Sequence, residues 1–110
     1  MKNIYDVNRI NCGLSTKTIN LINGVFNKYS AIKKAVLYGS RAKGNYKKGS
    51  DIDLTLYSDD VSHELLVSIM VDLDELLLPY MIDLSFYTQI NNENLKEHID
   101  RVGVVFYERR

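Results

Sequence analysis

The spacing of apolar residues predicts three helices. Such side chains recur every three or four positions in three segments: about 15–29, about 60–77 and about 92–101. Each segment begins at a residue type that caps helices, namely Ser15, then Asp60 or Ser62, and finally Asn92. The second segment has the widest apolar stripe, which consists of Leu65, Leu66, Ile69, Met70, Leu73, Leu76 and Leu77. Each helix therefore has one apolar face to bury.

Short apolar runs and period-two alternation predict strands at 35–38, 52–57, 81–87 and 104–107. In the segment 52–57, the apolar side chains face one way and Asp53 faces the other. This order of elements favours an α+β, two-layer fold, in which a small mixed β-sheet has its helices packed on one face. The opposite face would then carry Asp51, Asp53 and Asp83.

Length and composition allow one modest core. With 110 residues, 45% of them hydrophobic, the chain is expected to form a single domain over 1–110. Residues 1–14 have no clear period and are expected to be a loose lead-in. The N-terminal residues lack the apolar core of a signal peptide, and no apolar run is long enough to span a bilayer. Because Cys12 is the only cysteine, a disulfide within the chain is excluded. We therefore expect a cytoplasmic protein.

Charge is balanced overall but segregated along the chain. The 14 basic and 14 acidic residues give no net charge, so we expect neither membrane binding nor stable nucleic-acid binding. Residues 33–50 contain six basic residues and no acid, whereas residues 51–95 contain ten acids and no Lys or Arg. Such segregation often reflects two solvated faces. Here it also places a cationic segment directly before paired carboxylates.

Asp51 and Asp53 are candidate metal ligands. Two residues apart on a strand, they leave the same face with Cα atoms about 6.5–7 Å apart. Close carboxylates repel one another unless a cation lies between them, and oxygen ligands suit Mg²⁺ or Mn²⁺. The alternative is a pair of solvated surface aspartates. Because aspartate is depleted in strands, we favour metal binding.

Gly39 and Ser40 follow a buried strand and could open a helical turn that binds an anion. A Gly-Ser pair in this place is a weak signal alone, and its value lies in preceding the carboxylates. A Walker A loop is excluded, because Asn45 and Tyr46 stand where Lys and Ser or Thr should follow Gly44. A calcium-binding EF-hand loop from Asp51 is excluded as well, since leucine replaces its required glycine.

Asp83 has three readings that the sequence leaves open. It could be a third metal ligand, a general base, or an aspartate at a strand edge held by a main-chain N–H. His63 and His98 lie in helical, acid-rich surroundings and are interpreted as surface residues. Cys12 and the tyrosines show no pattern of nucleophile and base.

The segment GSRAKGNYKKGSDIDL, residues 39–54, resembles the Gly-Ser-x10-Asp-x-Asp signature of the DNA polymerase β-like nucleotidyltransferases. It is similar in particular to the minimal nucleotidyltransferases (MNT), the MntA-type antitoxins of prokaryotic HEPT/MNT toxin–antitoxin pairs. The likeness extends to the preceding VLYGS, to MIDLSFY with Asp83, and to the final GVVFYER. It implies a nucleotidyltransferase fold.

The resemblance implies a set of roles. It gives metal binding and catalysis to Asp51, Asp53 and Asp83, and nucleotide binding to Gly39, Ser40, Arg41 and Lys43. Two Mg²⁺ ions, or Mn²⁺ in their place, would assist the transfer of AMP from ATP to a hydroxyl, and Asp83 would help to deprotonate this acceptor. In the MNT group the acceptor is a tyrosine of the HEPT partner, a helical RNase-type toxin that is thereby silenced. A homo- or hetero-oligomer is therefore expected.

Three functions remain open from the sequence. The first is an MNT-type antitoxin that adenylylates a partner protein. The second is a transferase that acts on a small molecule such as an aminoglycoside. The third is a module without catalysis that neutralises its partner by binding alone. An apparently complete set of catalytic residues argues against the third.

Overall fold

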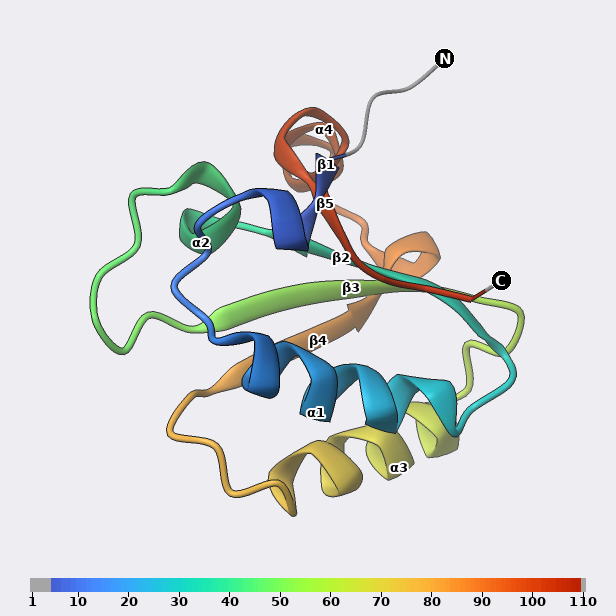
Figure 1. Cartoon of the computed structure of the whole chain (residues 1–110). Helices are drawn as coiled ribbons and strands as arrows, with labels where there is room; N and C mark the ends of the chain where they lie inside the picture. Colours follow the sequence, from blue (N-terminus) through green and yellow to red (C-terminus); the bar gives the residue numbers. More distant parts are fainter. Residues whose placement is uncertain (1–4, 110) are drawn as a thin grey trace.

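The computed structural model describes residues 5–109, which form a five-stranded sheet with helices on both sides (Figure 1). The strands are β1 (Tyr5–Asp6), β2 (Ile32–Tyr38), β3 (Ile52–Ser58), β4 (Ile82–Phe86) and β5 (Val104–Glu108). The helices are α1 (Thr16–Asn27), α2 (Ser40–Lys43), α3 (His63–Asp74) and α4 (Glu93–Val102). Two short 3₁₀ turns, η1 (Val7–Arg9) and η2 (Tyr87–Gln89), complete the order.

The strand order is β1-β5-β2-β3-β4, so that β4 lies at one edge. The central strand β2 is antiparallel to both β3 and β5, whereas β4 is parallel to β3 and β1 is parallel to β5. The predicted α+β fold with a small mixed sheet is confirmed. The first predicted strand is longer than expected, because pairing with β3 already begins at Ile32.

Helices α1 and α3 lie side by side on one face of the sheet and bury the main core with it (Figure 1). Their predicted caps are confirmed, since the Ser15 and Ser62 hydroxyls accept hydrogen bonds from the N–H groups of Thr18 and Leu65. The side chains of Ile22 in α1 and of other core residues are fully buried, as the apolar spacing predicts.

Helix α4 packs on the other face of the sheet. Its Ile99 is buried against Val36 and Tyr38 of β2. The prediction that the helices cover only one face is therefore wrong for α4. The reason is that β2 is apolar on both faces, with Ala35 and Leu37 pointing into the main core. Since α4 covers only part of its face, the end that carries the aspartates stays accessible.

Residues 5–14 are packed against the domain, whereas residues 1–4 of the predicted loose lead-in lie outside the described residues. Strand β1 pairs with β5, and the side chains of Val7 and Cys12 are buried. The expectation of a loose segment is therefore wrong for 5–14. Burial of apolar side chains and strand pairing hold this segment in place, although its apolar residues follow no regular period. No helix within residues 5–109 has the length and apolar character needed to cross a membrane.

Helix α3 buries only some of the residues in the apolar stripe that the sequence predicts for it. Ile69 and Leu73 are buried, but the side chain of Met70 is 46% exposed. The helix also ends at Asp74, before the predicted end near residue 77. Leu77 adopts a left-handed conformation with a φ of 55° and is 88% exposed. The outer face of α3 is thus apolar and accessible.

Candidate active site

Gly39 forms the turn between β2 and α2 and lies directly against the carboxylate of Asp53. Its φ is +76°, a conformation that favours glycine. A Cβ atom at this position would lie 2.3 Å from Asp53 Oδ2, far inside van der Waals contact. Only glycine therefore lets the main chain pass so close to the carboxylate. Ser40 begins α2 at this point.

Strand register brings the predicted aspartates to one end of one sheet face. Tyr38 in β2 pairs with Asp53 in β3, which in turn pairs with Asp83 in β4. Adjacent strands are about 4.8 Å apart, so Asp53 and Asp83 are direct neighbours across the sheet. Asp51 lies two residues before Asp53 and is exposed, as is Asp83 at the sheet edge. Three carboxylates are therefore gathered beside the turn at Gly39.

The electrostatics of this end of the sheet show an excess of negative charge. Burial raises the pKa of the Asp53 carboxyl above its ordinary value of 3.8, and the charges of Asp83 and Asp51 raise it further. The pKa of the Tyr38 phenol is also raised, first by burial and then by Asp83 and Asp53. A cation among these groups would relieve the repulsion between them.

The donor set fits a hard divalent cation. Carboxylate oxygens are the ligands that Mg²⁺ and Mn²⁺ prefer. Within residues 5–109, no group of three or more His, Cys, Asp or Glu side chains is arranged so that it could hold a metal ion by itself. Asp51, Asp53 and Asp83 instead offer an open surface of oxygen ligands. Such a surface suits Mg²⁺, which usually completes its coordination with water and substrate phosphates.

Arg41 is buried and anchors the loops around the turn. Its Nε and Nη2 atoms donate to the carbonyl oxygen of Ser50 at 3.2 and 2.9 Å, and its Nη1 donates to that of Cys12 at 2.8 Å. The guanidinium also lies against the rings of Tyr46 and Tyr80. The prediction that Arg41 contacts phosphate is contradicted, because its side chain is only 2% exposed and is held by main-chain carbonyls.

Two further residues lie around the turn. Lys43 is exposed at the end of α2, and its role in phosphate binding stays a prediction. His98 of α4, interpreted from the sequence as a surface residue, is half-buried, and its Nε2 accepts a hydrogen bond from the Gly39 N–H at 3.3 Å. Burial lowers the pKa of His98, and Lys43 and Arg101 lower it further, so the ring is neutral at pH 7. The sequence offers one signal of this burial, because His98 lies three residues after Leu95 and so shares a helix face with it.

The fold and the site together define a class of enzyme, the nucleotidyltransferases. The family model for polymerase beta nucleotidyltransferases matches residues 20–110. This span includes the turn at Gly39 and all three aspartates. The chain therefore belongs to the polymerase beta nucleotidyltransferase family. A comparison with curated proteins gives no match.

Solved structures of toxin–antitoxin complexes contain chains with the same fold. One, a complex with AMP-PNP, has a TM-score of 0.68 and 18% identity, covering 84% of this chain and 74% of that chain. A chain of the MntA–HepT complex has a TM-score of 0.65 and 15% identity, covering 86% and 74%. A third comes from the tri-AMPylated Shewanella oneidensis HEPN toxin with its MNT antitoxin, with a TM-score of 0.64, 15% identity and coverage of 87% and 74%. At these identities the likeness establishes the fold.

The contact between Gly39 and Asp53 predicts that Gly39→Ala is more harmful than an ordinary glycine substitution. A left-handed φ costs a residue with a Cβ atom about 1–2 kcal/mol, and here the methyl group must also displace the carboxylate. Gly44→Ala is a control for positive φ alone, since Gly44 has a φ of +84° with a ψ of 6°, against −156° at Gly39, and nothing lies within 4 Å of its added Cβ. Urea denaturation should show a larger loss for Gly39→Ala, and only this variant should lose Mg²⁺–ATP binding. Equal losses in both variants would contradict the contact.

The raised pKa of Asp53 predicts a pH-dependent effect of Asp53→Asn on stability. The folded chain holds this proton more tightly than the unfolded chain, so stability falls as pH rises from below 3.8 to above the raised pKa. In EDTA at pH 7, Asp53→Asn should therefore unfold at a higher urea concentration than wild type. The difference should vanish below pH 3.8, where both side chains are neutral. Glu108→Gln, at the exposed end of β5, is the control. A less stable Asp53→Asn at pH 7 would contradict the assigned repulsion.

Proposed function

We propose that this nucleotidyltransferase is an MNT-type antitoxin that uses Mg²⁺ to transfer AMP from ATP to a tyrosine hydroxyl of a HEPT-type toxin. One observation carries the proposal: the turn at Gly39 lies against the Asp53 carboxylate, beside Asp83. Main-chain N–H groups in a tight turn suit phosphate oxygens, and clustered carboxylates suit the cation that accompanies them. The site therefore has complementary places for both parts of a metal–nucleotide complex.

In this proposal the chain binds and orients the nucleotide. The turn of Gly39 and Ser40 holds the β- and γ-phosphates, with Ser40 as the donor because the Gly39 N–H donates to His98. The exposed ammonium of Lys43 adds positive charge beside them. Asp51, Asp53 and Asp83 would hold Mg²⁺, which when bound would neutralise the phosphates and support the departure of pyrophosphate. Arg41 contributes indirectly, by fixing the loop after α2 at Ser50 and the segment before α1 at Cys12.

The transfer itself exchanges one bond to the α-phosphorus for another. The acceptor hydroxyl oxygen bonds to the α-phosphorus, and the bond to the bridging oxygen of pyrophosphate breaks, leaving its electron pair with pyrophosphate. The hydroxyl proton passes to a carboxylate, for which Asp83 is the best placed. It lies on the edge strand β4 and is exposed, so an acceptor carried by another protein can reach it.

The structural neighbours support the nucleotide and the kind of partner. One neighbouring complex holds AMP-PNP, an analogue of ATP, and another contains a tri-AMPylated HEPN toxin together with its MNT antitoxin. The aspartates and the glycine turn support the chemistry independently, because they belong to this chain. On this proposal the protein acts in the cytoplasm and forms a complex with its toxin.

The proposal is tested by measuring the mass of the partner protein. The chain is co-expressed with the protein encoded by the neighbouring open reading frame, and the purified partner is measured by intact-mass spectrometry. Wild type should add whole AMP units. Asp53→Asn should remain folded and bound but add none, because the site loses a charged ligand. Asp60→Asn, an exposed aspartate after β3, is the matched control and should add AMP as wild type does.

Three results would count against the proposal. A partner that is fully neutralised without any gain in mass would favour the binding module without catalysis. Transfer of AMP to the hydroxyl of an aminoglycoside, with no effect on the partner, would favour a small-molecule transferase. Modification of the partner by Asp53→Asn at the wild-type rate would contradict the metal site.

A further inference from the structure

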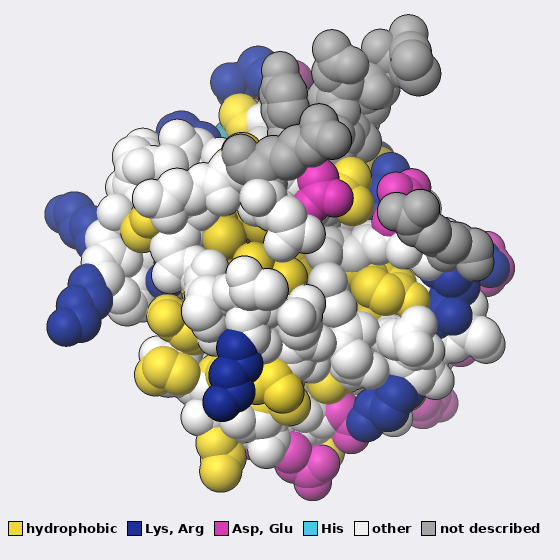
Figure 2. Space-filling model, in the orientation of Figure 1, with side chains coloured by type: hydrophobic (Ala, Val, Ile, Leu, Met, Phe, Trp, Pro, Cys, Tyr) yellow, Lys and Arg dark blue, Asp and Glu magenta, His cyan; other side chains and the backbone are white. Residues whose placement is uncertain are grey.

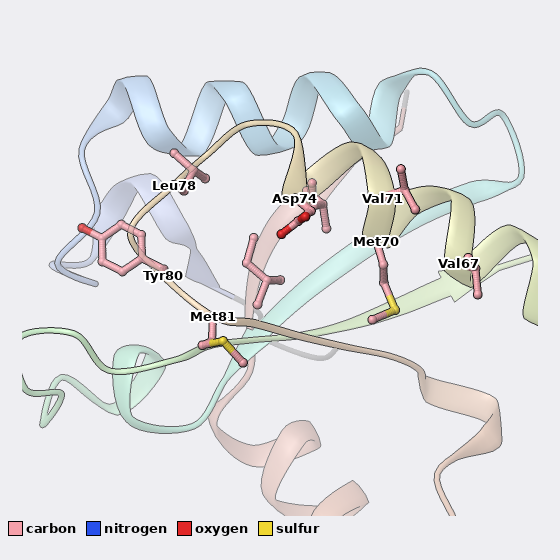
Figure 3. A pocket seen from close by; sticks show the side chains of 9 residues that line it. Val67, Met70, Val71, Asp74, Leu78, Tyr80 and Met81 are labelled. Atoms are coloured by element: carbon pink, nitrogen blue, oxygen red, sulfur yellow. The ribbon is translucent and has the colours of Figure 1, made fainter.

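An apolar groove with a volume of about 450 Å³ runs along α3, outside the site described above (Figure 3). Met70 and Val71 of α3 line one side of it. Tyr80 and Met81, in the segment that leads into β4, line the other. Figure 3 shows Asp74 among these side chains, near the end of α3. The groove is thus a mainly apolar hollow with one carboxylate among the side chains that line it.

The exposed apolar residues of the described chain are concentrated at this place. Six large hydrophobic side chains within residues 5–109 are exposed, and five of them belong to α3 and the segment after it: Val67, Met70, Val71, Leu77 and Met81. Met70 is 46% exposed and Met81 is 73% exposed. The sixth, Leu21, lies on α1. All of these five except Leu77 line the groove, and exposed apolar residues gathered in this way typically mark a surface for binding another molecule.

The charge along the α3 side of the groove is acidic, whereas Lys47 and Lys48 line a neighbouring pocket that shares Tyr80 with the groove. Asp74 lines it, Glu75 follows at the end of α3, and Glu64 is exposed in the first turn of that helix. Residues 51–95 contain no Lys or Arg. Figure 2 shows acidic side chains next to hydrophobic ones along the lower edge of the molecule, where α3 lies. A partner that complements this surface would carry basic residues around an apolar centre.

The shape of the groove suits a helix. Val67, Met70, Val71 and Asp74 are spaced by three, one and three residues, so they form one ridge along two turns of α3. At 1.5 Å per residue this wall is about 10 Å long. An amphipathic helix of two or three turns can lay its apolar face in such a groove.

The groove and the aspartates lie on opposite faces of the sheet but share its edge strand β4. Ile82, which lines the groove, is followed in β4 by Asp83, whose side chain points to the opposite face of the sheet. Because β4 is the edge strand, a molecule in the groove can extend around this edge to the aspartates. The distance from groove to carboxylate is one residue along the chain.

We propose that this groove docks a helical segment of the toxin partner, apolar on one face and flanked by Lys or Arg, and so brings the acceptor hydroxyl to Asp83. The inference rests on the proposed function and adds the surface by which the partner is recognised. Binding energy from the groove holds the partner, while the aspartates act on the acceptor. Changes in the groove therefore raise the KM for the partner and leave nucleotide binding intact.

The test compares groove variants with matched controls elsewhere on the surface. Met70→Lys/Met81→Lys places two cations in the apolar hollow and should weaken partner binding at least about tenfold. Leu21→Lys makes the same kind of change on α1 and should have no effect. Asp74→Lys should weaken binding by about three- to tenfold at low salt, whereas Glu108→Lys should not. Affinity is measured by calorimetry with the purified partner, and KM and kcat are measured by AMP incorporation. Mg²⁺–ATP binding is measured on each variant in the absence of the partner.

The outcomes separate this inference from the proposed function. A higher KM with unchanged kcat, melting temperature and Mg²⁺–ATP binding in the groove variants supports it. If wild type binds and modifies the partner and Met70→Lys/Met81→Lys does both equally well, the groove assignment is overturned while the proposed function stands. If that variant instead abolishes self-association of the isolated chain without changing partner binding, the groove joins two copies and the inference is overturned. A wild-type chain that neither binds nor modifies the partner overturns both.

Discussion

The close passage of the Gly39 main chain beside the Asp53 carboxylate is the constraint on which the site depends. It requires a left-handed turn immediately after Tyr38, and it holds the beginning of α2 next to β3. The same contact keeps Asp53 half-buried beside Asp83 and so contributes to the raised pKa of its carboxyl. A carboxylate kept charged in such a place costs stability until a cation arrives. This cost is consistent with the cation binding that we propose for the site.

The surrounding structure holds this turn from two sides. From α4, His98 accepts the hydrogen bond of the Gly39 N–H, and Ile99 fixes that helix on the sheet. From α2, Arg41 reaches into the interior and ties the turn to the carbonyl oxygens of Cys12 and Ser50. A buried guanidinium needs such partners, because its charge is costly to remove from water. Segments far apart in sequence thus fix one short turn, while the carboxylates remain accessible at the end of the sheet.

Much of the fold, and the placement of Asp53 and Asp83 side by side on one sheet face, could be predicted from sequence, because they depend on local patterns. Alternation in β3 separates Asp53 from its apolar neighbours, and the caps Ser62 and Asn92 begin their helices as expected. The burial of Arg41 could not be predicted, since its partners are main-chain carbonyls from distant loops. The position of α4 was missed for a related reason. The apolar run 35–38 of β2 is consistent with a strand covered on both faces, but it does not show which helix covers the second face.

The central claim is that the turn at Gly39 and the aspartates together bind a metal–nucleotide complex. The most direct measurement is a structure of the chain with Mg²⁺ and a non-hydrolysable ATP analogue. The account predicts the β- and γ-phosphates against Gly39 and Ser40, with the cation on Asp53 and Asp83 and the Arg41 guanidinium still on its carbonyl partners. Phosphates bound elsewhere on the chain, or a nucleotide held with no cation on Asp53, would contradict it.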